Sequence, residues 1–372
     1  MQYRRFGKTN LKLSVFSLGT MRYLASEENA RQVIYQAVTL GINHIETARG
    51  YGKSEQYLGA ALSGGLPVPR SQLYITSKIQ PVVDADTMRR HIDESLRLGL
   101  DYLDFLAIHG LNTWEHLEWL HHSGCMSAVQ EALADGRVRH VGFSSHGATE
   151  VILAALDTDL FEFVNLHYYY FFQRHAAAVQ AAYEKDLGVF IISPADKGGR
   201  LYTPPPKLRD LCYPFSPLEL NYRFLLSDPR ITTLSVGPAT PNELIEPLSV
   251  ADRDRSLTPL EVEVLQRLHQ ASSLATDRCS QCYACLPCPE NIQIPEILRL
   301  RNLAVAYDMT EYGKYRYQMF ENAGHWFPGV KGNRCNECGD CLPRCPENLD
   351  IPTLLADAHQ RFNGTPRRRL WD

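Results

Sequence analysis

Two runs of cysteine near the C-terminal end of the chain constrain its fold more than any other feature of the sequence. Residues 279–289 read CSQCYACLPCP, and residues 335–346 read CNECGDCLPRCP. Each run continues into nearly the same phrase, ENIQIPEIL in the first case and ENLDIPTLL in the second. Eight of the ten cysteines lie beyond residue 278. Such a repeated, closely spaced set predicts metal ligands rather than a disulfide framework, because cytosolic thiols remain reduced.

The repeat resembles the two halves of a bacterial-type two-cluster ferredoxin. In that pattern three thiolates, two residues apart, hold three irons of a cubane, and the cysteine ahead of proline binds the opposite cluster. The resemblance implies two [4Fe-4S] clusters, one held by Cys279, Cys282, Cys285 and Cys345 and the other by Cys335, Cys338, Cys341 and Cys288. The first motif has two residues, not three, before its last cysteine. Structural zinc is the alternative, although zinc sites commonly use two separate CxxC pairs.

Upstream of the repeat, short apolar or β-branched segments alternate with segments of helical spacing. The strand candidates are VFSLG from Val15, HIETA from His44, LYITSK from Leu73, LDFLAI from Leu103, RHVGFSS from Arg139, FVNLH from Phe163, VFIISP from Val189 and TTLSVG from Thr232. Alternating strands and helices predict right-handed βαβ units and a parallel sheet. Eight units in about 240 residues, without a Gly-rich dinucleotide fingerprint after the first strand, favour a closed barrel over an open sheet.

The predicted fold class is therefore α/β, a (β/α)8 TIM barrel followed by a small α+β ferredoxin-like iron–sulfur domain. We expect the barrel over residues 1–255, a linker or helix over residues 256–276, and the cluster domain over residues 277–372. Two long loops, 110–125 and 198–215, are candidates for a lid or for a rigid surface excursion. The first loop contains His116, His121 and His122, which we expect to be solvated.

Composition excludes several kinds of partner. The net charge is −4, with 38 basic residues against 42 acidic ones, so no strong field for nucleic acid or an anionic membrane is expected. No run of eighteen apolar residues occurs, and the opening MQYRRFGKTNLKLS has no apolar h-region behind its charges. These features predict a cytoplasmic protein without a membrane or nucleic-acid partner.

Polar residues at the ends of the strand candidates form the predicted active site. Glu46, Lys78 and His109 close the second, third and fourth candidates, and Tyr51 follows in the loop after the second. Four segments carry a resemblance to the aldo-keto reductases: YRRFGKTNLKLSVFSLGTM, INHIETARGYGKSEQYLG, SLRLGLDYLDFLAIHG and DGRVRHVGFSS. The resemblance implies that Tyr51 is the proton donor, Lys78 the lysine that lowers its pKa, and His109 the histidine that orients the carbonyl. Glu46 stands where the family has aspartate.

These residue types suit carbonyl reduction. Hydride addition builds negative charge on the carbonyl oxygen, and a nearby acid must supply a proton as that charge forms. A free phenol has a pKa of about 10 and is a reluctant donor at neutral pH. An ammonium group beside the phenol lowers that pKa, and a carboxylate holds the ammonium charged and in place.

The resemblance also implies a site for a nicotinamide nucleotide, NADP(H) or NAD(H). The implied contacts are Ser144, Ser145, Asn165, Ser193, Gly237, Thr240 and Asn242. Ile192 occupies the position where many members of the family stack a tyrosine on the nicotinamide ring. The segment VGPATPNELIEP lacks basic residues that would hold a 2′-phosphate, and it contains Glu243.

The leading hypothesis is an iron–sulfur oxidoreductase that interconverts a small-molecule carbonyl and alcohol with a nicotinamide nucleotide. Its clusters would exchange electrons with a ferredoxin-type electron-transfer protein. A second hypothesis omits the nucleotide and drives the barrel through the clusters, with a flavin, which no motif reveals, as a candidate intermediate. A third makes the chain a non-catalytic redox-sensing interaction protein. Barrel specificity resides in variable loops, so the strand-end residues indicate the reaction type and not the substrate.

Overall fold

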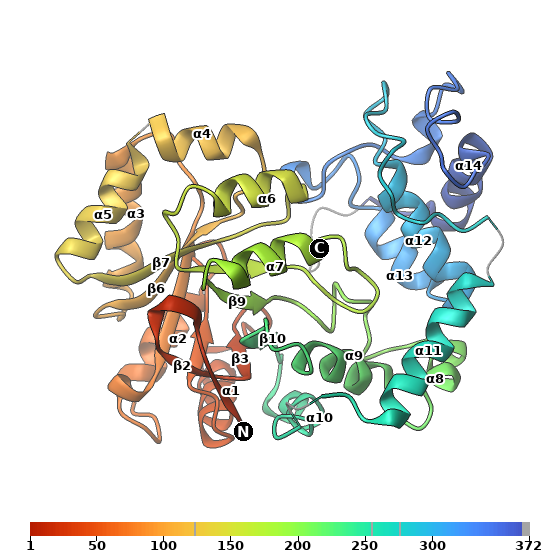
Figure 1. The fold of residues 1–372 in the computed structure, drawn as a ribbon. Coiled ribbons are helices and arrows are strands. Elements are labelled where there is room, and N and C mark those ends of the chain that lie inside the picture. Colours follow the sequence, from red (N-terminus) through yellow and green to blue (C-terminus); the bar gives the residue numbers. More distant parts are fainter. Residues whose placement is uncertain (123, 254–255, 275–276, 367–372) are drawn as a thin grey trace. The chain divides into compact units, whose positions relative to one another are not determined.

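A closed barrel of parallel strands forms the first part of the computed structural model, which describes residues 1–122, 124–253, 256–274 and 277–366 (Figure 1). Around the barrel the strands follow the order β10-β3-β4-β5-β6-β7-β8-β9. They are β3 Phe16–Gly19, β4 His44–Glu46, β5 Tyr74–Ile79, β6 Leu103–His109, β7 Val138–Ser144, β8 Phe163–Leu166, β9 Gly188–Ile191 and β10 Thr233–Val236. The predicted closed parallel barrel is confirmed, and each of its strands coincides with a predicted segment.

Helices surround these strands, as Figure 1 shows. They are α1 Glu27–Thr39, α2 Ser54–Ser63, α3 Ala85–Arg97, α4 Trp114–His122, α5 Cys125–Ala134, α6 Thr149–Leu156, α7 Ala176–Glu184, α9 Pro217–Leu226 and α10 Ile245–Leu248. In α1, Ser26 caps the N-terminus by accepting a hydrogen bond from the amide of Asn29. The buried residues of α1 are Ala30, Val33, Ile34, Ala37 and Val38, which is the apolar face that helical periodicity predicts.

An antiparallel hairpin of β1, Tyr3–Arg5, and β2, Lys12–Ser14, precedes the barrel. Phe6 follows β1 and is 1% exposed. The centroid of its ring is 5.3 Å from the ring centroid of Phe105 and 5.4 Å from that of Phe163. Phe105 and Phe163 lie on β6 and β8, so the hairpin contributes a side chain to the barrel core.

The adjacent His44 is fully buried between the hydroxyls of Ser17 and Thr76. Burial lowers the pKa of His44 to about 3, and this imidazole is therefore neutral.

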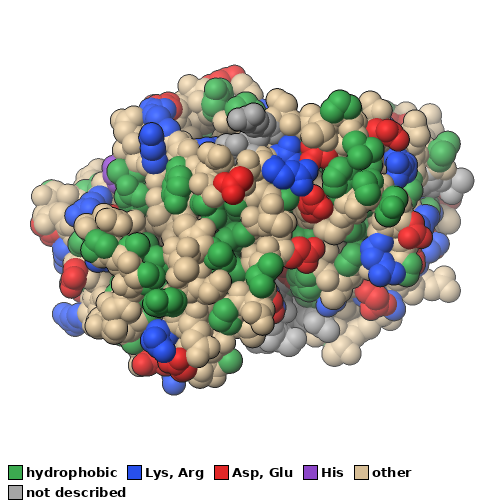
Figure 2. Space-filling model, turned by 90° about the horizontal axis from the view of Figure 1, so that it is seen from below, with side chains coloured by type: hydrophobic (Ala, Val, Ile, Leu, Met, Phe, Trp, Pro, Cys, Tyr) green, Lys and Arg blue, Asp and Glu red, His purple; other side chains and the backbone are tan. Residues whose placement is uncertain are grey.

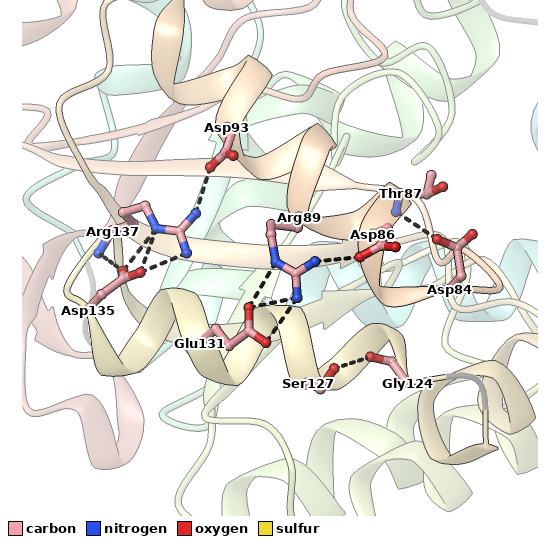
Figure 3. Close-up of polar contacts among 10 residues, drawn as sticks. All are labelled: Asp84, Asp86, Thr87, Arg89, Asp93, Gly124, Ser127, Glu131, Asp135 and Arg137. Carbon is pink, nitrogen blue, oxygen red and sulfur yellow. Dashed lines mark hydrogen bonds and ion pairs between the residues drawn. The ribbon is translucent and has the colours of Figure 1, made fainter.

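Ion pairs connect α3 to α5 on the outside of the barrel (Figure 3). Arg89 of α3 contacts Asp86 on its own helix and Glu131 on α5. Arg137, just before β7, contacts Asp93 and Asp135. These side chains are substantially exposed, so each pair adds little stability and mainly fixes orientation.

The chain divides into two compact units. The first comprises Met1–Gly198 and Asn221–Ser256, and the second comprises Gly199–Leu220 and Leu257–Asp372. The segment 199–220, which follows β9, thus belongs to the unit that carries the cysteines. Within that unit, Arg267 donates hydrogen bonds to the carbonyls of Leu211 and Tyr213, and Lys207 donates to that of Val305.

Regular structure in the second unit is helical. Its helices are α8 Pro206–Cys212, α11 Pro259–Ser273, α12 Ile294–Tyr307, α13 Thr310–Tyr317 and α14 Ile351–Phe362. In the described part of this unit, pairing between strands is limited to an isolated bridge between Ile292 and Val330. The described part of the ferredoxin-like module is thus mainly helical. Each cysteine run leads instead into an Ile-Pro pair that begins a helix, α12 or α14, and proline is well suited to the first turn.

The surface carries both signs of charge. On the face shown in Figure 2, basic and acidic side chains are interspersed. Among the described residues, none of the helices combines the length and the apolar character needed to cross a membrane.

Candidate active site and cysteine cavities

A buried ion pair lies at the carboxyl ends of β4 and β5. The Lys78 Nζ atom is 2.7 Å from the Glu46 Oε1 atom, and the two side chains are 1% and 5% exposed. Lys78 also donates a hydrogen bond to the carbonyl of Thr47 at 2.7 Å. Asn165 of β8 donates from Nδ2 to the same Glu46 oxygen at 3.0 Å. Glu46 therefore holds two side chains from opposite sides of the barrel mouth.

Tyr51 and His109 complete this group. The Lys78 Nζ atom lies 4.7 Å from the centre of the Tyr51 ring. The rings of Tyr51 and His109 have centroids 5.7 Å apart and meet edge to face, at 83°. His109 is the last residue of β6 and is 9% exposed. The structure thus brings together Glu46, Tyr51, Lys78 and His109, the four residues predicted to be catalytic.

Burial controls the ionisation of this group. Burial raises the pKa of Tyr51 well above its usual value, and the negative charge of Glu46 adds to the effect. Burial lowers the pKa of Lys78, whereas the charge and hydrogen bond of Glu46 oppose that shift. The sequence comparison implied that Lys78 lowers the pKa of Tyr51. Burial and the charge of Glu46 act in the opposite direction, and the phenol is protonated at neutral pH.

The Glu46 carboxylate can be tested directly. In Glu46→Gln, Lys78 loses the group that raises its pKa, so we expect the basic limb of the pH–rate profile to move to lower pH. Displacement of Lys78 on the ångström scale should cost on the order of a hundredfold in kcat/KM. Glu46→Asp keeps the charge and should lose less. Glu28→Gln, at an exposed carboxylate on α1, is the matched control; equal rates for wild type and Glu46→Gln would show that the charge is dispensable.

The predicted nucleotide contacts fall into two groups. Near the catalytic residues, Ser144 accepts a hydrogen bond from the amide of Gly110 at 3.0 Å, and Ser145 donates to the carbonyl of Leu111 at 2.7 Å. Ser193 follows β9 and has a left-handed backbone, with φ of 54°. The second group, Gly237, Thr240 and Asn242, follows β10, where Thr240 and Asn242 are exposed.

Arg22, which was not predicted as a site residue, lies at the second group. Its guanidinium donates to the carbonyl of Gly237 at 2.9 Å and to Glu243 at 2.8 Å. Glu243 also accepts a hydrogen bond from the amide of Ala239 at 3.1 Å. Arg22 lies three residues beyond the end of β3, a position at the same mouth of the barrel. That position in the sequence is the signal that could have identified it.

A histidine pair at the mouth was also missed. His146 and His167 lie two residues beyond Ser144 and Asn165, which are opposite each other on β7 and β8. Side chains two residues apart along an extended chain lie on the same face. The alternation that places Ser144 and Asn165 at the mouth therefore also predicts the histidine pair there. The Nε2 atoms of the two rings are 3.3 Å apart.

His116 corrects an expectation about the loop after β6. The loop contains α4, and His116 is 8% exposed, not solvated. Its Nδ1 atom is 3.0 Å from the carbonyl of Gly110 and 3.2 Å from the amide of Asn112. Helix α4 directs this side chain toward the preceding residues 110–112. The side chains of His121 and His122 lie outside the described part of the structure.

The cysteines of the repeat surround two cavities in the second unit. One encloses about 300 Å³, partly open to solvent, and is lined by Cys279, Cys282, Cys285 and Cys345. The other spans about 340 Å³, is also partly open to solvent, and is lined by Cys288, Cys335, Cys338 and Cys341. Each cavity therefore receives three cysteines from one motif and the last cysteine of the other, and this is the grouping that the ferredoxin resemblance implies.

Three thiols in these cavities, those of Cys279, Cys285 and Cys341, have raised pKa values. Burial raises the pKa of Cys285 to about 12, and neighbouring cysteines add to the shift. Burial also raises the pKa of Cys279 and Cys341. Iron binds thiolates, so assembly of a cluster here must displace protons from these cysteines.

A closed barrel that gathers a tyrosine, a lysine–carboxylate pair and a histidine at one mouth defines a class of oxidoreductases. The chain belongs to the aldo/keto reductase family, whose family model matches residues 16–203. A model described as a 4Fe-4S dicluster domain matches residues 278–349. The family and the iron–sulfur module predicted from the sequence are both confirmed.

Similar proteins support the assignment of the barrel. The chain is 32% identical over 157 residues to L-galactose dehydrogenase of Arabidopsis thaliana, covering 39% of this chain and 48% of that protein. It is 30% identical over 165 residues to morphine 6-dehydrogenase of Pseudomonas putida, covering 43% and 53%. The chain thus spans about half the length of these curated relatives. A solved aldo-keto reductase from Bacillus halodurans has the same fold, with a TM-score of 0.63 at 22% identity over 72% of this chain and 96% of that one.

Proposed function

We propose that this protein interconverts a small-molecule carbonyl and alcohol with a nicotinamide nucleotide, while its clusters exchange electrons with a redox partner. The observation that carries the proposal is the group formed by Tyr51, Lys78, Glu46 and His109. A protonated phenol beside an ammonium that a carboxylate holds in place, with an imidazole ring next to it, is suited to protonating an oxygen that gains negative charge.

The proposed roles follow from the contacts. Tyr51 donates its proton to the carbonyl oxygen as negative charge develops there, because the alkoxide that forms is a stronger base than a phenolate. Lys78, held by Glu46, stabilises the phenolate that remains. His109 orients the carbonyl against Tyr51. When bound, the nucleotide supplies or accepts the hydride.

Asn165 supports a nucleotide site beside this group. Its Nδ2 atom must face Glu46, because an ionised carboxylate only accepts hydrogen bonds. The Asn165 Oδ1 atom is buried and has no hydrogen-bond partner in the described residues. A buried acceptor without a partner is costly, and a carboxamide N–H of a nicotinamide would satisfy it. Ser144 and Ser145 lie on the neighbouring strand end and would border the same group.

The preference between nucleotides should be weak. Arg22 is paired with Glu243, and Glu243 would repel a 2′-phosphate, so we expect NADP(H) to be favoured over NAD(H) by less than tenfold in kcat/KM. Glu243→Lys should increase the preference for NADP(H), whereas Glu184→Lys on α7 should not. A wild-type preference of a hundredfold, about 2.8 kcal/mol, would require a phosphate-binding residue that lies elsewhere.

The two cysteine-lined cavities are the evidence for the proposed pair of [4Fe-4S] clusters. Each cluster would transfer one electron at a time. A hydride carries two electrons at once, so direct exchange with a cubane needs a bridging group that tolerates one-electron steps. A bound flavin, or a substrate that stabilises a radical, would serve. A ferredoxin-type protein is the proposed electron partner.

Turnover tests this proposal against its alternatives. Anaerobic holoprotein is assayed with NADH or NADPH and a panel of aldehydes and quinones, and its bound nucleotide or flavin is identified after denaturation. Nucleotide-dependent reduction supports the proposal. Reduction driven only by a reduced ferredoxin would favour a barrel that works without the nucleotide, and no turnover with either donor would favour a sensing role.

A further inference from the structure

The two cysteine motifs differ in chemistry at one equivalent position. Gln281 is the third residue of CSQC, and Glu337 is the third residue of CNEC. Both have a left-handed backbone, with φ of 64° for Gln281 and 59° for Glu337. The two residues therefore occupy the same place in two similar loops, between the first and second cysteines of each motif.

Gln281 donates a hydrogen bond to a cysteine sulfur. Its Nε2 atom is 3.4 Å from the Sγ atom of Cys279 and 2.8 Å from the carbonyl oxygen of Pro295, at the start of α12. An amide nitrogen carries two hydrogens, so both bonds can form together. The contact with Pro295 fixes the amide and keeps one N–H directed at the sulfur.

Glu337 cannot make this contact. An ionised carboxylate has no hydrogen to donate, and the exposed Glu337 adds a negative charge beside Cys338 instead. Asp340 and Arg344 of the second motif carry opposite charges, and each cavity has one further glutamate in its lining, Glu290 or Glu347. The first motif has no charged residue between Cys279 and Cys288. The second motif therefore has an excess of one negative charge, and Glu337 supplies it.

These contacts have opposite effects on cluster reduction. An added electron makes the cluster more negative, so an N–H donor to a ligand sulfur stabilises the reduced state and a nearby negative charge destabilises it. Greater solvent exposure of a cluster also stabilises its reduced state, and this effect would favour the second cluster. However, each set contains one exposed cysteine, Cys282 or Cys338, and the sets differ by a single buried cysteine.

We infer that Gln281 and Glu337 give the cluster of Cys279, Cys282, Cys285 and Cys345 the higher reduction potential of the two. The inference rests on the proposed pair of clusters with exchanged ligands. Electrons that enter at the second motif would then pass downhill to the cluster of the first motif. The relay has a direction, and one residue in each loop sets it.

Redox titration of the anaerobic holoprotein, followed by electron paramagnetic resonance, tests the inference. Gln281→Leu removes the N–H donor without adding charge and should lower the higher-potential step. Glu337→Gln removes the negative charge and should raise the lower-potential step. We expect each variant to change its reduction equilibrium about tenfold, which is about 59 mV for a one-electron couple. Glu311→Gln, the same charge change at an exposed residue of α13, should move neither step.

Iron and sulfide analysis separates this inference from the proposed function. If every variant holds close to eight irons and Gln281→Leu leaves both steps unchanged, the tuning role is refuted while the clusters stand. A shift of the lower-potential step in Gln281→Leu would reverse the proposed order. A wild-type protein with only four irons would contradict the two-cluster model itself and the inference with it.

Discussion

Tyr51→Phe should abolish most carbonyl reduction while leaving nucleotide affinity nearly unchanged. The substitution removes only the hydroxyl, which acts in the transition state, so kcat and kcat/KM should fall together. Loss of a general acid typically costs about 10²- to 10⁴-fold. Steady-state kinetics and nucleotide titration by fluorescence measure the two effects separately.

Two further measurements sharpen this test. Tyr35→Phe removes a phenol from the exposed side of α1, where Tyr35 is 47% exposed, and should leave the rate unchanged. The raised pKa of Tyr51 predicts that wild-type reduction persists to higher pH than an ordinary phenol, with a pKa of about 10, would allow. Full activity of Tyr51→Phe would exclude the proposed proton transfer.

Serine substitution of the last cysteine in either motif should destroy the cluster of the other motif. The wild-type protein, kept anaerobic, should contain about eight irons and eight acid-labile sulfides per chain and, once reduced, show the spectrum of two interacting spins. Cys345→Ser should halve the iron content, because Cys345 lines the cavity of the first motif. Cys288→Ser should do the same through the cavity of the second.

Variants within each motif identify which cluster is lost. The spectrum of Cys345→Ser should match that of Cys282→Ser, and the spectrum of Cys288→Ser should match that of Cys338→Ser. Cys125→Ser, at a buried thiol of α5, should retain the full complement of iron. If Cys345→Ser instead matched Cys338→Ser, the exchange of ligands would be ruled out.

Much of the barrel could be predicted from local sequence. β-Branched runs separated by helical periodicity located each barrel strand, because buried parallel strands carry an apolar signal of their own. The hairpin of β1 and β2 escaped prediction because three-residue strands such as Tyr3–Arg5 are too short and too polar to show a period. The segment 198–215 was predicted as a loop of the barrel, since local sequence does not reveal which core a segment joins.

The candidate site was predictable where each residue ends a strand. Glu46, Lys78 and His109 could be placed at one mouth because parallel strands align their carboxyl ends. The pairing of Arg22 with Glu243 could not be predicted, because the two residues are 221 positions apart and meet only when β3 and β10 become neighbours. The pKa of Tyr51 also needed the structure, since burial is a property of the folded chain.

The membership of the segment 199–220 determines how this protein can be divided. The polypeptide passes between the units at 198/199, at 220/221 and at 256/257, so one unit is interrupted by part of the other. Leu208 and Cys212, in α8, are buried. A cut at residue 256 would leave α8 in the barrel fragment without α11, whose Arg267 binds its C-terminal carbonyls. A fragment that ends at residue 256 would therefore carry part of the cysteine-bearing unit without the helix that contacts it.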